Sequence, residues 1–140
     1  MHYRTMTIND YDAAIALWSE SEGVRIRDAD SRQGIEKYLL RNPGLSFVAE
    51  VEGEGEGEGE EELVGTIMAG HDGKRGYVQH LSVADSHRRL GIATRLVSLC
   101  LEALKNEGIQ KSHLMILPEN EAAQTFWASQ GWAYRSDILL

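Results

Sequence analysis

Apolar residues recur along this 140-residue chain with two periods, one typical of strands and one typical of helices. Alternation at every second residue predicts six strands, at residues 3–8, 45–51, 63–70, 77–83, 111–117 and 132–138. A spacing of three to four residues predicts four helices, at residues 10–22, 31–41, 91–107 and 120–130. This order indicates an α/β (α+β) fold, in which a mixed sheet of about six strands is flanked by four helices. The length fits one domain over residues 1–140.

Polar residues and glycines mark the ends of the expected helices. Asn9 or Asp10 can cap the first helix, and Gly23 would end it. The second helix would begin near Asp30 or Ser31. The third has the clearest apolar stripe, formed by Ile92, Leu96, Leu99, Cys100, Ala103 and Leu104. Because Cys100 belongs to this stripe, we expect it to be a small buried hydrophobe and not a nucleophile.

Residues 52–62 form a low-complexity tract of glycine and glutamate. The tract contains seven glutamates and no lysine or arginine. Because it joins the strands expected at 45–51 and 63–70, we interpret it as the solvated tip of a hairpin. Phosphate-binding loops are also rich in glycine, but strict alternation never gives the G-x-G-x-x-G spacing, and glutamate repels phosphate. We therefore expect the tract to take no part in the chemistry.

The net charge of -8 comes mostly from this tract. Removing its seven glutamates from the 22 acidic side chains leaves 15 against 14 lysines and arginines. The rest of the chain is therefore close to neutral. A chain with this balance and no broad basic face is a poor binder of nucleic acid or of an anionic membrane. An anionic ligand would need a local concentration of positive charge.

The remaining composition excludes further classes of site. A single cysteine, Cys100, excludes a disulfide within the chain and a cysteine-rich zinc site. The histidines His2, His71, His87 and His113 show no metal-ligand spacing, so we expect no metal. No apolar run is long enough for a signal peptide or a membrane span. We therefore expect a cytoplasmic protein, as a monomer or a homodimer, that binds no membrane.

One window of the chain is basic. No acidic residue occurs between Ser86 and Leu101, whereas Arg88, Arg89 and Arg95 all lie there. The window includes the loop that leads to Gly91, where the longest helix is expected to start. A helix start presents free backbone N–H groups, and glycine lets an anion approach the backbone closely. The pattern favours a phosphate-binding site, and the alternative is a solvated basic loop beside a structural helix.

Two sequence motifs lie at or within the third and fourth expected helices. The first is the run Arg88-Arg89-Leu90-Gly91-Ile92-Ala93, which follows the strand at 77–83. The second consists of Asn120, Ala123, Phe126, Trp127, Gly131 and Trp132. Together they resemble the signatures Q/R-x-x-G-x-G/A and N-x-x-A-x-x-F-Y-x-x-x-G-F of the GNAT superfamily of N-acetyltransferases. In the order of elements, the resemblance extends over about residues 1–134.

The resemblance implies acetyl-CoA as the acetyl donor and a sheet that is splayed at its central strands. At the matching positions, backbone N–H groups would hold the pyrophosphate of CoA, those of Arg89, Leu90, Gly91, Ile92, Ala93 and Thr94. Arg88 would add positive charge. The residues that would meet the pantetheine arm are Leu81, Ser82, Val83 and Asn120. The N–H of Val83 would also polarise the acetyl carbonyl, and Phe126 and Trp127 would form a wall of the site.

The chain departs from the family pattern at Trp127. The family commonly has a tyrosine at this position, which is proposed to protonate the departing CoA thiolate. An indole N–H donates a hydrogen bond but is too weak an acid to give up its proton. Water or another residue such as Tyr134 would then supply the proton, or catalysis would be slow. The alternative role of Trp127 is to pack the wall of the site.

An acetyltransferase acting on an amine also needs a base, because an alkylamine is mostly protonated at neutral pH. Gln79 and His80 lie on the central strand, where alternation would let only one of them face the cleft. We name His80 as the candidate base because imidazole titrates near neutral pH, with a structural histidine as the alternative. Glu22, Asp28 and Asp30 lie in the segment that lines the acceptor site in this family. They could bind a cationic amine or be surface carboxylates.

We therefore predict an N-acetyltransferase that moves an acetyl group from acetyl-CoA to a primary amine by direct attack in a ternary complex. The acceptor stays open between a small molecule and a protein amine. The main alternative is a catalytically weak or inactive acyl-CoA-binding or interaction module with the same fold, which Trp127 keeps open. Nucleic-acid binding through the three arginines of the basic window is a weaker alternative, because no broad basic face accompanies them.

Overall fold

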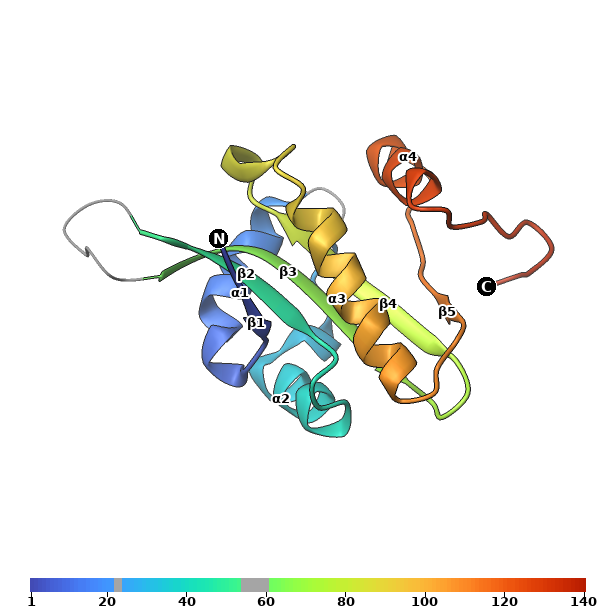
Figure 1. Ribbon diagram of the computed structural model, residues 1–140, viewed down its shortest axis with the longest axis horizontal. Helices are drawn as coiled ribbons and strands as arrows, with labels where there is room; N and C mark the ends of the chain where they lie inside the picture. The colour runs from blue at the N-terminus through green and yellow to red at the C-terminus, as the bar shows by residue number, and fades with distance from the viewer. Residues whose placement is uncertain (22–23, 54–60) are drawn as a thin grey trace.

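The computed structural model describes residues 1–21, 24–53 and 61–140 (Figure 1). The strands in these ranges are β1 (His2–Thr5), β2 (Phe47–Glu52), β3 (Glu61–His71), β4 (Gly76–Val83) and β5 (Ser112–His113). The α-helices are α1 (Tyr11–Glu20), α2 (Arg32–Arg41), α3 (Ile92–Asn106) and α4 (Glu121–Ser129). Three short 3₁₀ turns accompany them, η1 (Ile8–Asp10), η2 (Asp28–Asp30) and η3 (Asp85–His87). The predicted fold class and the four predicted helices are confirmed.

The strands form one mixed sheet in the order β1-β2-β3-β4-β5. Neighbouring strands are antiparallel from β1 to β4, and β5 is parallel to β4. The strands β2 and β3 form the predicted hairpin, whose last described pair is Glu52 with Glu61. Residues 54–60 of the glycine–glutamate tract lie outside the described residues, so the interpretation of its tip stays a prediction.

The structure differs from the prediction at the last two strands. The strand expected at 111–117 is reduced to the two residues of β5, and the strand expected at 132–138 is wrong, because that segment has no strand. A run of alternating residues becomes a strand only when it finds a partner for its backbone. The short β5 offers almost no edge, and most residues beyond Gly131 are exposed. The described sheet therefore has five strands and not six.

Helices cover both faces of the sheet. On one face, α1 and α2 pack through Ala14, Trp18 and Ile35 against Val48 and Met68 of the sheet. On the other face, α3 lies across the middle strands, as Figure 1 shows, and packs through the predicted apolar stripe, except that Val97 and not Leu99 belongs to the core. This helix comes very close to β3 at one glycine. A Cβ added to Gly65 would lie 3.1 Å from both Ile92 and Leu96, so a larger residue there would push α3 outward.

The segment between β1 and α1 is held differently from the prediction. Thr7, and not Asn9, caps the turn η1 by accepting a hydrogen bond from the Asn9 N–H. The carboxylate of Asp10 makes no cap bond to α1. It accepts instead from the Thr7 N–H and from Arg4. In α2 the prediction holds, because the Ser31 hydroxyl accepts from the Gly34 N–H at 3.1 Å.

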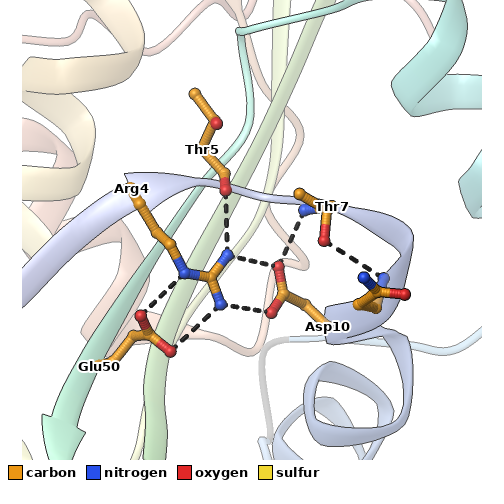
Figure 2. A network of polar contacts seen from close by, with 6 residues as sticks. Arg4, Thr5, Thr7, Asp10 and Glu50 are labelled. Carbon is orange, nitrogen blue, oxygen red and sulfur yellow. Dashed lines mark hydrogen bonds and ion pairs between the residues drawn. The ribbon is translucent and has the colours of Figure 1, made fainter. Parts of the chain in front are cut away.

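An arginine on β1 joins two buried carboxylates (Figure 2). The Arg4 guanidinium donates to both carboxylate oxygens of Asp10, at 2.6 and 2.9 Å, and to both of Glu50, at 2.8 and 3.1 Å. Asp10 and Glu50 are buried, whereas the Arg4 side chain keeps 33% of its exposure. Hydrogen bonds to Asp10 and then to Glu50 raise the pKa of Arg4, so it stays charged. The triad ties β1, β2 and η1 together.

Candidate active site

The sheet opens between β4 and β5. The ladder between β4 and β5 contains only two pairs, Gly76 with Ser112 and Tyr77 with His113. Beyond Tyr77, no strand of the described residues pairs with this edge of β4. The Ala84 N–H donates to Val64 on the β3 side at 2.8 Å. Because backbone groups alternate between the two edges of a strand, the N–H of Val83 points toward the open edge.

The predicted residues on β4 take up different positions. The side chains of Leu81 and Val83 pack in the core beneath α3, and their main chain runs along the open edge, as the predicted contact with pantetheine requires. Ser82 does not lie at this edge. It pairs with Thr66 of β3, and its buried hydroxyl hydrogen-bonds that of Ser21 on the α1 side. Ser82 therefore points away from the open edge, and its contact with CoA stays a prediction.

The loop before α3 has the backbone geometry of an anion site. Arg89 and Gly91 both have left-handed φ values, 65° and 79°. In the part of the chain that the structure describes, no backbone N–H from Arg89 to Thr94 donates a hydrogen bond. Gly91 at the N-cap position has no side chain that could satisfy them. Six successive N–H groups without a partner at a helix start are donors that phosphate oxygens can use.

The side chains of this loop leave the site open and positive. Leu90 is exposed, whereas Ile92 is buried and anchors the start of α3. Arg88 forms an ion pair with Asp85 at 2.9 Å, but both side chains are well exposed. An exposed pair of this kind contributes little, so Arg88 can turn to an anionic ligand at small cost. Arg95 lies 5.9 Å above the Tyr3 ring and does not take part in the loop.

The second motif builds the start and the inner face of α4. Asn120 caps this helix through its side-chain oxygen, which accepts a hydrogen bond from the Ala123 N–H at 3.0 Å. Only the NH₂ group of the Asn120 side chain therefore stays available to a ligand. Phe126, Trp127 and Trp132 form an edge-to-face aromatic cluster in which Trp127 is buried. The role of Trp127 as a wall is therefore consistent with its packing. Tyr134 is 92% exposed on the segment after α4 and lies in no cluster.

A bulge in β4 turns His80 toward the α1–α2 face. Thr66 pairs with Ser82 and Met68 with Gln79, so β4 has one residue more than β3 between these pairs. His80 itself has a left-handed φ of 53°. Its Nε2 lies 2.8 Å from the Asp30 carboxylate, and its ring meets Trp18 edge to face. Gln79 lies beside Tyr38 of α2 on the same face, so the predicted alternation of Gln79 and His80 is wrong.

The structure separates the three carboxylates considered for acceptor binding. Glu22 lies outside the described residues, and Asp28 is exposed on η2. Asp30 is buried and turned toward His80. Sequence reasoning found Asp30 as a candidate but missed its partner, because nothing in the spacing of residues 30 and 80 indicates a contact. The only signal was a histidine on the central strand, which the bulge then redirected.

Two further features bear on the chemistry. A concavity of about 320 Å³ opens at the start of β4 and is lined by Tyr38, Tyr77 and His113 among others, so it offers room beside β4. Cys100 is buried as predicted, and burial raises the pKa of its thiol to about 12, which keeps it from acting as a nucleophile.

Among the described residues, no cluster of three or more His, Cys, Asp or Glu side chains could hold a metal. None of their helices is long and apolar enough to cross a membrane.

Comparison with known proteins identifies the family. The sequence model of the acetyltransferase (GNAT) family matches residues 11–132. The chain belongs to this family. An acetyltransferase of Pectobacterium atrosepticum is 36% identical over 122 residues, which cover 87% of this chain and 80% of that protein. An acetyltransferase of Sodalis glossinidius is 32% identical over 140 residues, which cover 100% of this chain and 92% of that protein.

The GNAT fold is also seen in solved structures. The PaiA N-acetyltransferase of Thermoplasma acidophilum, solved in complex with coenzyme A, superposes with a TM-score of 0.80. It is 17% identical, and the match covers 98% of this chain and 92% of that one. The predicted resemblance to the GNAT superfamily is thus confirmed. The open edge of β4 and the loop before α3 are the parts of this GNAT fold that carry the candidate site.

Proposed function

We propose that this GNAT protein is an N-acetyltransferase that transfers the acetyl group of acetyl-CoA to a primary amine by direct attack in a ternary complex. One observation carries the proposal: the six free N–H groups from Arg89 to Thr94 lie at the start of α3, next in the chain after the open edge of β4. The first feature suits a pyrophosphate, and the second suits an extended arm with amide groups. Coenzyme A contains both groups. The protein would act as a cytoplasmic single domain, as a monomer or a homodimer.

Different residues would bind different parts of acetyl-CoA. The loop before α3 would hold the pyrophosphate, with Arg88 as an additional cation. The main chain of Leu81 and Val83 would pair with the pantetheine arm, and the Val83 N–H would donate to the acetyl oxygen. The NH₂ group of Asn120 can donate to the same arm from the other side. Phe126 and Trp127 would exclude water from the thioester.

The proposed reaction transfers one acetyl group and releases one proton. His80 would take a proton from the ammonium form of the acceptor, and the free amine nitrogen would bond to the acetyl carbon while the carbon–sulfur bond breaks. The products are the amide and CoA, whose sulfur takes up the second proton lost by the nitrogen. The His80 proton returns to solvent. No enzyme nucleophile is needed, in agreement with the burial of Cys100.

The direct test measures CoA release from acetyl-CoA with a panel of amines that includes small polyamines and peptides with free N-termini. We expect turnover that depends on the amine, and an acetylated product whose mass increases by one acetyl group. Isothermal titration should show CoA binding with the free enzyme. CoA release that is independent of every amine would contradict the transfer reaction.

The replacement of Trp127 by tyrosine tests how the CoA thiolate is protonated. We expect Trp127→Tyr to raise kcat several-fold, because a phenol can give up a proton that an indole cannot. The smaller ring should also lower the free energy of unfolding by about 1–3 kcal/mol, since Trp127 is buried against Phe126 and Trp132. Trp127→Phe is the matched control, because it has the same six-membered ring as the tyrosine variant without the hydroxyl. An equal kcat in both variants would show that residue 127 is not the source of the proton.

The presence of an indole in place of a phenol at residue 127 keeps a second function open. A chain without a thiolate acid could be a catalytically weak or inactive acyl-CoA-binding module. It would show thermal stabilisation by CoA, but no turnover with any amine in the wild type or in either Trp127 variant. This combination would favour the binding module over the enzyme.

A further inference from the structure

His80 and Asp30 form a buried pair between β4 and η2. The Nε2 of His80 lies 2.8 Å from Oδ1 of Asp30, and their side chains keep 13% and 9% of their exposure. Because a carboxylate only accepts hydrogen bonds, Nε2 must carry the proton that is shared with it. In the neutral ring the lone pair then lies on Nδ1. No hydrogen bond among the described residues involves Nδ1.

Asp30 is itself held from two sides. Its second oxygen, Oδ2, accepts from the Arg27 N–H at 3.0 Å. Its carbonyl oxygen accepts from the Tyr11 hydroxyl at 2.6 Å. These bonds attach the short turn η2 to α1 and leave Oδ1 free to face β4. The carboxylate therefore has one fixed orientation toward His80.

The histidine is fixed from its other sides. The ring of Trp18 contacts it edge to face, with centroids 4.6 Å apart. The Trp18 N–H donates to the Thr66 hydroxyl at 2.9 Å, and that hydroxyl donates to the His80 carbonyl at 2.8 Å. Thr66 thus holds the backbone of the bulge, where the φ of 53° is unfavourable for a residue with a Cβ. A strained position held by so many contacts is typical of a functional site.

We propose that Asp30 is the positioning residue for His80. It fixes the imidazole as the Nε2–H tautomer, keeps the ring in place, and leaves the Nδ1 lone pair to accept one proton from the acceptor ammonium. The imidazolium formed in this step is stabilised by the Asp30 carboxylate until the proton leaves to solvent. This proposal rests on the proposed function, in which His80 is the base. It assigns Asp30 to the base and not to the binding of the amine.

The proposal is tested on the full-length chain with Asp30→Asn, in which the side-chain oxygen can still accept from the Arg27 N–H, so the turn η2 should survive. With its oxygen on the Arg27 N–H, the asparagine turns its NH₂ group toward Nε2, and this group can only donate. The nitrogen shifts of the His80 ring in ¹⁵N NMR should therefore show the Nε2–H tautomer in the wild type and the Nδ1–H tautomer in the variant. This readout does not depend on activity.

Steady-state kinetics supply the second readout. We expect Asp30→Asn to lower kcat by about tenfold, with the CoA affinity and the KM for acetyl-CoA unchanged. In a His80→Gln background the same substitution should have no further effect, because Asp30 acts through His80. Asp12→Asn is the matched control, since Asp12 is an exposed carboxylate on α1 whose side chain keeps 95% of its exposure. It should change neither readout.

The outcomes separate this proposal from the proposed function. A tautomer that stays fixed in Asp30→Asn, or a loss of kcat that adds to that of His80→Gln, would overturn the positioning role. A loss of kcat in Asp30→Asn no larger than that in Asp12→Asn would also overturn the positioning role. If the wild type acetylates no amine but the tautomer depends on Asp30, the pairing stands while the proposed function fails.

Discussion

Gly91→Glu will weaken the binding of CoA by at least about 100-fold and leave most of the fold intact. Gly91 has a φ of 79°, and a Cβ added there would meet no atom within 4 Å, so the new side chain fits but strains the backbone by about 1–2 kcal/mol. Its carboxylate would lie among the N–H groups proposed for the pyrophosphate. Two like charges about 4 Å apart repel by about 4 kcal/mol near the surface of a protein, which exceeds the roughly 2.8 kcal/mol that a 100-fold loss of affinity requires. Isothermal titration with CoA measures the loss.

Gly108→Glu supplies the matched control for this prediction. Gly108 follows the other end of α3, has a φ of 85°, and also has open space around a Cβ. The control therefore imposes the same backbone strain and the same charge without touching the loop before α3. Gly91→Asn tests the charge separately, because asparagine tolerates the left-handed region. Equal CoA affinity in Gly91→Glu and Gly108→Glu would reject the loop as the pyrophosphate site.

Elements with a strong local signal could be predicted from the sequence. The helix α3 was found from its apolar stripe, and the hairpin of β2 and β3 from alternation on both sides of the glycine–glutamate tract. The loop before α3 was found because charge, glycine and a helix start coincide within a few residues. In each case the physical cause lies within the segment itself.

Features that depend on distant partners could not be predicted. The segment 132–138 alternates as a strand does, but it finds no edge to pair with. Ser82 lies in the middle of the motif on β4, yet its side chain is occupied by Ser21. The bulge at His80 inserts one residue against β3 and moves both Gln79 and His80 to one face. A bulge is set by the register of two strands, and a single strand sequence does not contain that register.

The charges of the molecule also act locally. The overall charge of -8 would oppose a highly anionic ligand. The loop before α3 can still bind an anion, because its donors are mainly backbone N–H groups. These groups are present whatever the balance of acidic and basic side chains. Salt should therefore weaken CoA binding less than it weakens the binding of a nucleic acid by a basic face. The acidic total is thus compatible with a CoA site and still excludes a general polyanion binder.

Arg4→Met will destabilise the fold by about 3 kcal/mol in the free energy of unfolding, as measured by urea denaturation. The substitution leaves Asp10 and Glu50 buried and facing each other without their cation, and breaking a buried pair in this way costs about 3–5 kcal/mol. We expect the lower end of that range because Arg4 keeps 33% of its exposure. Asp10 also keeps its bond from the Thr7 N–H. CoA affinity should not change, because the triad is separate from the loop before α3.

The double variant Arg4→Met with Glu50→Met identifies the cause of this loss. It removes one of the two stranded carboxylates and fills its space, so at least half of the lost stability should return.

Arg135→Met is the control. Arg135 makes a similarly short pair with Asp137, but both side chains are exposed, so the denaturation midpoint should stay unchanged. Since the hydrogen bonds to Asp10 and Glu50 raise the pKa of Arg4 above its ordinary value, its contribution is fully present below that ordinary value and is lost only in strongly alkaline solution. The contribution of Arg4 in the wild type is therefore constant near neutral pH. A loss of stability that persists in full in the double variant would show that Arg4 acts through packing and not through charge.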